Sequence, residues 1–361
     1  CLQPEFLTLN KKIYNSEFRI LNSEFFFELV IVKKLFAKFL ILFVIFSFCS
    51  CGGKKYATDE CGCFFDFDDA KYLAKKKGTD FLVVITNDGD DELSSYFIKS
   101  VLKSPDFKSS VLKKYNVIHF DFSQKTYAKT QVGEGATEEM LKQAELIQRT
   151  ASKGFLISRK LNCQSAPSIY RFSKNGFFVS EVVIEKDDYS VLNFVKQVEA
   201  SDKKSLELEE QYKATKEGSV VERMKKIDSL FTSFNLVEKS FADVLIKDAI
   251  SIDKTNESGL VVKYLMQDVD NITTDLCNEK KFSEAAELYY KLAQNELVDT
   301  DTKINCYFYA AYILAMTNDM EQIPQILKYL EAGKALNPES DAAIEFDDMY
   351  NYFKELSESA E

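Results

Sequence analysis

Two patterns of apolar residues divide the chain. Between residues 64 and 200, short apolar runs of strand length alternate with segments in which apolar residues recur at helical spacing. Residues 81–86 (FLVVIT) predict a buried strand, residues 116–122 (NVIHFDF) predict a second, and residues 169–184 predict a hairpin that turns at Lys174-Asn175-Gly176. After residue 200 only the helical spacing remains. The pattern therefore predicts an α/β domain at 64–200 and an all-α domain at 201–361.

Helices are expected between the strands of the first domain. They are predicted at 67–77, from residue 92 to just before Pro105, at 138–149 and at 187–200. The second begins where Asp90 and Asp91 can cap it, because carboxylates are favourable at the positive end of a helix. The predicted order is helix, strand, helix, strand, insertion, two strands and a final helix.

This order resembles the thioredoxin-like family, whose fold is a central mixed sheet flanked by helices. The most specific stretch is 166–176 (APSIYRFSKNG), which is similar to that family's cis-proline strand, turn and antiparallel strand. The resemblance implies a cis peptide bond before Pro167. It also places the family's Cys-x-x-Cys pair at Asp91 to Ser94, where this chain has no cysteine. Because thiol–disulfide exchange requires a thiolate, the resemblance implies a degenerate, redox-inactive junction.

The cysteines offer a second candidate for redox chemistry. Among the eight cysteines, Cys61 and Cys63 form the remaining paired motif, and such a C-x-C pair can form a strained, reactive disulfide. The alternatives are a pair of tether cysteines or a structural bridge to Cys163. Cys163 lies four residues before Pro167, so it could face the degenerate junction or be a buried free thiol.

Other catalytic and metal-binding signals are weak. His119 is the single histidine, which excludes a multi-histidine metal site in one chain. His119 and Asp121 point to the same face of a predicted strand and could form an acid–base pair, but a histidine bonded to a neighbour is commoner. The acidic stretch 87–92 lacks EF-hand spacing, so we expect it to cap a helix. We predict no cofactor and no metal.

The C-terminal half resembles tetratricopeptide-like helical hairpins. Residues Phe282, Ala285, Tyr289 and Ala293 fit a second helix of such a repeat, and 335–338 (ALNP) fits a repeat end. Ala249, Ala293 and Ala335 are 44 and 42 residues apart, however, rather than the 34 of that family. We therefore expect an irregular helical array in which tyrosines and phenylalanines pack between helices, with an exposed subset forming a protein-binding groove. Cys277 and Cys306 could be bridged or could be buried thiols.

The N-terminal region predicts export. Residues 33–53 (KKLFAKFLILFVIFSFCSCGG) combine a positive start, an apolar core and small residues, and the core is shorter than the roughly 20 residues that a bilayer span needs. The segment resembles a bacterial lipoprotein signal, with Cys51 as the lipidated residue; an uncleaved anchor is the alternative. Residues 1–31 contain a near-duplicate (IYNSEFR, ILNSEFF), and we expect them to be an over-extended leader, followed by a signal peptide at 32–50 and a tether at 51–63.

These features together predict a binding protein rather than an enzyme. The net charge of −11 argues against a nucleic-acid partner. A thioredoxin-like groove beside a cis-proline receives extended chain by backbone pairing, so the expected partner is a protein or peptide. The protein would be a scaffold, lipid-anchored to a bacterial membrane and facing the periplasm or the surface. The alternatives are a variant thiol–disulfide oxidoreductase that uses Cys61 and Cys63, with Cys163, and a hydrolase around His119.

Overall fold

The structure of the protein is a computed structural model that describes residues 56–133, 135–339 and 341–360. The predicted leader, signal peptide and lipidated Cys51, together with the first residues of the predicted tether, lie outside the described residues. None of the helices in the described ranges combines the length and the apolar composition that crossing a bilayer requires.

A small mixed sheet lies at the centre of the first half. Its strands are β1 (Phe81–Thr86), β2 (Asn116–Asp121), β3 (Ser168–Phe172) and β4 (Phe178–Glu181), in the order β2-β1-β3-β4. The first two strands are parallel, β3 is antiparallel to β1, and β4 is antiparallel to β3. Every residue of β1 is buried, which explains its uninterrupted apolar run.

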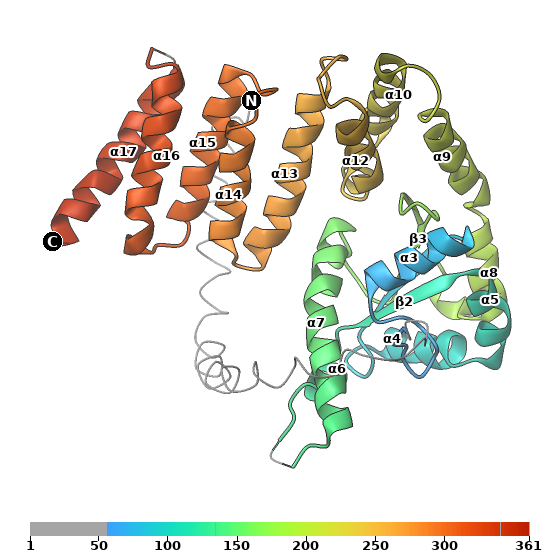
Figure 1. Cartoon of the computed structure of the whole chain (residues 1–361). Helices are drawn as coiled ribbons and strands as arrows, with labels where there is room; N and C mark the ends of the chain where they lie inside the picture. The colour runs from blue at the N-terminus through green and yellow to red at the C-terminus, as the bar shows by residue number, and fades with distance from the viewer. Residues whose placement is uncertain (1–55, 134, 340, 361) are drawn as a thin grey trace, which may run out of the picture. The chain divides into compact units, whose positions relative to one another are not determined.

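Side chains of β1 alternate between two separate cores. Leu82 and Val84 pack on one face, against α4 (Glu92–Phe97), the π-helical segments η1 (Ile98–Leu102) and η2 (Phe107–Val111), and α8 (Val191–Glu199). Phe81 and Val83 pack on the other face, against α3 (Phe67–Lys77) and α7 (Glu138–Lys160). The two-residue period of a strand produces this division, and Figure 1 shows helices on both sides of the sheet.

The inserted helix is longer than the sequence predicts. We expected it to end near Arg149, whereas α7 continues to Lys160. Gly154 in its second half weakens the sequence signal for a helix. At this position the helix lies so close to β2 that a Cβ atom on Gly154 would be 2.7 Å from the ring of Phe120. Close packing on Phe120 therefore requires Gly154, and the same glycine lowers the helix propensity of the sequence, which is why the helix was predicted to end too early.

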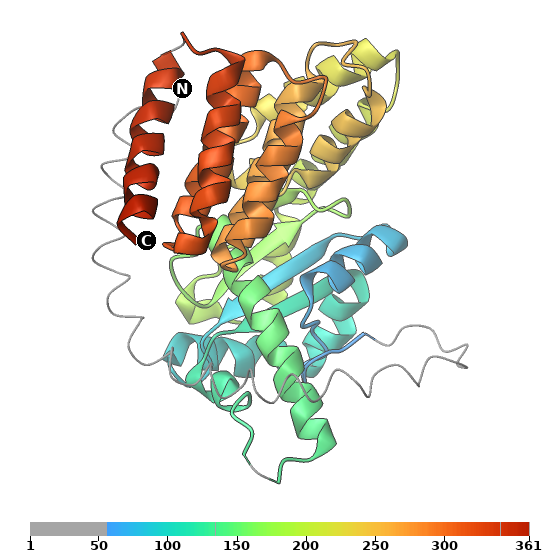
Figure 2. The same ribbon diagram turned by 60° about the vertical axis from the view of Figure 1, so that its left-hand side comes forward.

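The second half is entirely helical in the described residues. Its elements are α9 (Asp202–Ala214), α10 (Val220–Ser233), α11 (Leu236–Lys239), α12 (Asp243–Ile252), α13 (Val261–Asn278), α14 (Phe282–Ala293), α15 (Thr300–Ala315), η4 (Met320–Gln322), α16 (Ile323–Leu336) and α17 (Asp341–Ala360). Each helix from α12 to α17 packs against the next, and Figure 1 and Figure 2 both show α13 to α17 side by side. A small mixed sheet followed by many helices is compatible with a thioredoxin-like domain and a helical domain.

Aromatic side chains pack between these helices together with aliphatic ones. Tyr289 and Tyr307 are buried, and the rings of Tyr290 and Tyr329 stack with their centroids 5.1 Å apart. Tyr312 remains 40% exposed. Tyrosine hydroxyls also join neighbouring helices, as where the Tyr289 hydroxyl on α14 donates to Asp270 Oδ1 on α13 over 2.6 Å.

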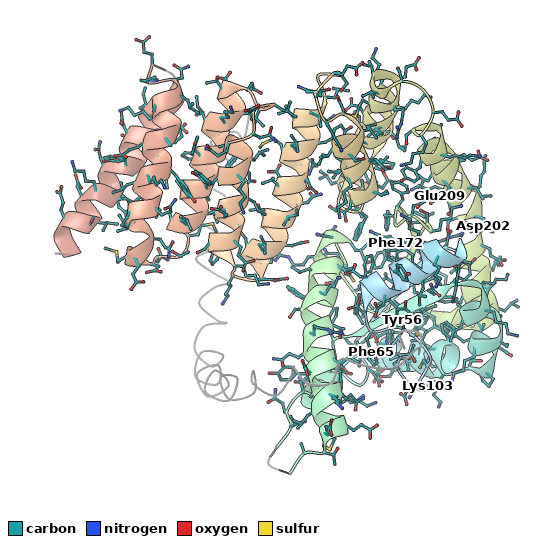
Figure 3. All side chains as sticks on the ribbon, in the orientation of Figure 1. Tyr56, Phe65, Lys103, Phe172, Asp202 and Glu209 are labelled. Carbon is teal, nitrogen blue, oxygen red and sulfur yellow. The ribbon has the colours of Figure 1, made fainter. Side chains whose placement is uncertain are left out.

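One buried arginine joins the sheet to the helical half. Arg171 on β3 is 4% exposed and donates from Nε and Nη2 to Asp80 Oδ2, over 3.0 and 2.7 Å. Its Nη1 donates to Asp202 Oδ1 and to the Val198 carbonyl oxygen, both over 2.6 Å. These acceptors lie before β1, at the start of α9 and near the end of α8, so a single guanidinium positions three elements. Figure 3 labels one of the acceptors, Asp202.

Shared apolar packing reinforces this connection. Phe177, beside β4, lies in a core with Tyr212 and Phe234 of the helical half. Phe241, between α11 and α12, packs on the sheet with its ring centroid 4.9 Å from that of Phe172. Residues 56–361 accordingly form one compact unit.

Replacing Arg171 with methionine is expected to destabilise the protein by about 3–5 kcal/mol, because Asp80 would lose its buried cation. The control is Lys203→Met, which removes an exposed ion pair with Glu207 on α9 and should cost less than about 0.5 kcal/mol. Urea unfolding measures both variants. An equal cost for the two would show that the buried pair does not hold the fold together.

Candidate functional site

The junction predicted at Asp91 to Ser94 lies at the N-terminus of α4, and a side chain caps this end of the helix. The Asp91 carboxylate is the N-cap of α4 and accepts a hydrogen bond from the Ser94 amide over 2.7 Å. The Ser94 hydroxyl is buried and accepts from the Asn87 amide over 3.1 Å. Both side chains are thus engaged in shaping the turn, and neither can replace a thiolate.

The acidic stretch before α4 is anchored to the helix that follows β2. Asp88 forms an ion pair with Lys125 over 2.7 Å, and this hydrogen bond lowers the pKa of Asp88. Asp90 accepts a hydrogen bond from the Gln124 amide over 2.7 Å, at the start of α6 (Gln124–Ala128). The described residues contain no group of acidic, cysteine or histidine side chains arranged to hold a metal ion. These carboxylates therefore fix a loop.

His119 belongs to a buried chain of hydrogen bonds. Its Nδ1 lies 2.8 Å from Asp59 Oδ2, and its Nε2 lies 2.9 Å from Thr86 Oγ1. Thr86 Oγ1 in turn donates to Asp121 Oδ1 over 3.2 Å. His119 and Asp121 are therefore linked through Thr86 rather than directly. Thr86 is completely buried, so the Asp-His-Thr arrangement cannot present its hydroxyl to a substrate.

Asp59 connects this chain to the two nearby cysteines. Its Oδ1 accepts hydrogen bonds from the amides of Cys61 and Cys63, over 2.9 and 2.8 Å. Gly62 between them has a φ of +89°, a left-handed conformation that suits glycine. Burial raises the pKa of Asp59, but the hydrogen bond and charge of His119 and the two amides outweigh it, so the pKa lies below its ordinary value.

Cys61 and Cys63 are buried free thiols. They are 2% and 0% exposed and lie in the core on the α4 and α8 face of the sheet. Burial, with the Asp59 and Glu60 charges, raises the pKa of the Cys61 thiol to about 12, and burial raises that of Cys63 well above its ordinary value. Such thiols are poor nucleophiles at neutral pH.

Cys163 is separated from that pair by the sheet. It is a free, half-buried thiol that packs on the α3 and α7 face and donates to the Ser165 carbonyl oxygen over 3.3 Å. The proposed bridge from Cys61 or Cys63 to Cys163 is therefore wrong, because the partners belong to cores on opposite faces. Of the two alternatives for Cys163, the free thiol agrees with the structure, and its side chain packs in a different core from Leu93 of the junction. In the helical half, Cys277 and Cys306 are free and pack in one core.

A groove lies beside the junction instead. It has a volume of about 230 Å³ and runs between Leu93 on α4, Pro167 and the segment that follows β4. The Ala166–Pro167 peptide bond is cis. Its lining residues are Leu93, Ser165, Ala166, Pro167, Ser168, Ile169, Glu181, Val182, Val183, Ile184, Lys186 and Tyr189. Eight of these twelve residues are apolar, but polar atoms make up more than half of the exposed lining, so the groove suits an extended segment that brings both an apolar side chain and backbone hydrogen-bonding groups.

Large apolar side chains extend from the groove onto the surface. Val183 is 66% exposed, and Tyr96 on α4, whose ring lies 5.8 Å from that of Tyr189, is 51% exposed. Exposed apolar residues gathered around a groove mark a surface that another molecule can cover. The predicted junction and Pro167 indicated this region, but no pattern in residues 181–189 indicated that this segment would form a wall of the groove.

Replacing Asp59 with asparagine is expected to cost about 1–3 kcal/mol at pH 7, since it weakens charge-assisted bonds to His119 and two amides. Because the pKa of Asp59 in the folded protein is below 3.8, its stabilisation is complete above pH 3.8 and is lost as the pH falls through the lowered value. The difference between wild type and variant should therefore narrow at acidic pH. Urea unfolding at several pH values measures it, with exposed Asp106→Asn as the control; a constant difference would contradict it.

The buried thiols are expected to resist alkylation. At pH 8, iodoacetamide should modify Cys163 while Cys61 and Cys63 stay unmodified until the protein is unfolded, because their thiolates are scarce and inaccessible. Peptide mass spectrometry on a time course measures this. Modification of Cys61 as fast as Cys163 would instead show an accessible, reactive pair.

Comparisons with known proteins cover the two halves unequally. A family model described as an uncharacterised protein C-terminal domain matches residues 260–356, within which α13 to α16 lie. No curated protein matches the chain. A solved structure, the DsbH oxidoreductase, is similar over 42% of this chain and 93% of its own, with 13% sequence identity and a TM-score of 0.28. A similarity at that TM-score carries no argument about function.

Proposed function

We propose that the protein binds an extended segment of a partner protein or peptide in the groove beside Pro167. The observation that carries this proposal is the groove of about 230 Å³ next to the unpaired backbone groups of Ala166. Neither the amide nor the carbonyl group of Ala166 has a hydrogen-bond partner among the described residues. An extended chain lying along Ala166 would satisfy both groups by backbone pairing.

The apolar lining would supply the specificity of this binding. A side chain of the bound segment would enter between Leu93, Pro167 and Tyr189, and exposed Val183 would be covered. Full burial of one valine or leucine side chain contributes about 1.5–3 kcal/mol, so this contact supplements the backbone pairing along Ala166 and does not suffice for binding by itself. This proposal requires no cofactor and no metal.

We propose further that the thioredoxin-like domain does not catalyse thiol–disulfide exchange. The helix start that would activate a thiolate carries the Asp91 carboxylate, which already interacts favourably with the positive end of α4. The remaining C-x-C pair, Cys61 and Cys63, is buried with raised pKa values. These features support a scaffold role in preference to an oxidoreductase.

The scaffold would act at a bacterial membrane, periplasmic or surface-facing. This part of the proposal rests on the sequence around Cys51, whose apolar segment and preceding small residue suit lipidation. The tetratricopeptide-like helices would provide a second protein-binding surface. Mass analysis of the N-terminal peptide of the native protein tests the anchor, and an unmodified Cys51 would refute it.

Replacing Val183 with glutamine is expected to weaken peptide binding at least about tenfold, because it places an amide on the apolar groove wall. The probe is a fluorescent, uncharged peptide in which valine alternates with serine, and anisotropy measures its affinity. The matched control is Leu206→Gln on α9, since Leu206 is 65% exposed and Val183 is 66% exposed.

The two variants separate groove binding from general stickiness. A loss confined to Val183→Gln supports the groove. An equal loss in both variants, or no binding of the peptide to the wild-type protein, would count against the proposed function.

A further inference from the structure

The segments that contain the groove's lining residues carry an excess of negative charge. They are residues 90–93 at the start of α4, 165–169 around Pro167 and 181–189 from the end of β4. Their acidic residues are Asp90, Asp91, Glu92, Glu181, Glu185, Asp187 and Asp188, and their one basic residue is Lys186. Glu181 and Lys186 line the groove itself, and the other six carboxylates lie within three residues of a lining residue along the chain.

Other parts of the protein do not neutralise these carboxylates. None of the seven forms an ion pair with a lysine or arginine in the described ranges. Asp91 is partly buried at its helix cap, and the other six are exposed. Nearby Asp88 differs, because Lys125 neutralises it.

The charge of one of these carboxylates, Asp91, acts on a residue that lines the groove. Burial, followed by the charge of Asp91, raises the pKa of Tyr189, which lines the groove. Lys186 also lines it, opposed within the same segment by Glu185 and Asp187. An acidic border thus approaches the groove from α4 on one side and from the segment after β4 on the other.

We infer that the groove selects a cationic partner: an extended segment with an apolar side chain flanked by lysine or arginine. This inference rests on the proposed function and specifies its partner. The apolar residue enters the groove, while the flanking cations meet the two acidic borders. An acidic segment of the same shape is rejected, because like charges placed together disfavour the wrong partner.

The charges act mainly through attraction at the surface. Six of the seven carboxylates are exposed, so each new pair contributes little by itself and salt screens it. Several pairs together raise the association rate and set the preference between partners. The charge preference should therefore be strong at low ionic strength and weak at high ionic strength.

Three fluorescent peptides with one alternating valine and serine core test this inference on the full chain. One is uncharged, one is flanked by lysines and one by glutamates. At low salt we expect the lysine peptide to bind about tenfold more tightly than the uncharged peptide, and the glutamate peptide to bind most weakly. These differences should shrink in 1 M salt, where the Debye length is about 3 Å.

A double variant identifies the carboxylates responsible. Glu185→Gln with Asp187→Asn should reduce the advantage of the lysine peptide by about threefold to tenfold, leaving the uncharged peptide unaffected. Within the described ranges, neither the Glu185 nor the Asp187 side chain makes a hydrogen bond or ion pair, so the fold should persist. The matched control is Glu139→Gln with Glu145→Gln, two exposed carboxylates on α7.

Each result separates this inference from the function on which it rests. Equal binding of all three peptides would overturn the charge preference and leave groove binding in place. Binding of the lysine peptide that Val183→Gln does not weaken would locate it outside the groove and overturn the inference. Failure of every peptide to bind would overturn both.

Discussion

The structure depends on satisfying one buried cation. Arg171 lies in a strand between two layers of helices, and a charge there is tolerated only if its donors are paired. Its acceptors come from Asp80 before β1, from Val198 near the end of α8 and from Asp202 at the start of α9. The hydrogen bonds that the Arg171 guanidinium needs therefore fix the position of the α8–α9 connection, where the helical half begins, relative to β3. Apolar contacts such as that of Phe241 with Phe172 then complete the junction.

The contacts of Arg171 also hold the strand that forms part of the groove wall. Ile169 on β3 lines the groove, two positions from Arg171, so the groove wall and the domain junction share one strand. On the other wall, Asp91 holds the start of α4. The Asp91 carboxylate interacts favourably with the positive end of this helix, and Leu93 two residues later lines the groove.

Sequence reasoning was most accurate where local chemistry is decisive. The run 81–86 became β1 with unchanged bounds, and Asp91 caps the helix that follows it. It was least accurate where partners lie far apart in the chain. Asp59 and His119 are 60 residues apart, and Arg171 and Asp80 are 91 apart, so no local pattern indicates either pair. Cys61 and Cys63 looked reactive by spacing, but their burial decides their chemistry.

Local sequence patterns were sufficient to predict the alternation of strands and helices and the change to helices after residue 200, and residue identity shows that the junction has no cysteine. Period, capping and residue identity are local properties, and they need no knowledge of the fold. Tertiary structure alone decided that Cys163 and the C-x-C pair lie on opposite faces, that Gly154 packs on Phe120, and that residues 181–189 meet Leu93 to form a groove. Those outcomes depend on which face each side chain takes in a sheet assembled from distant segments.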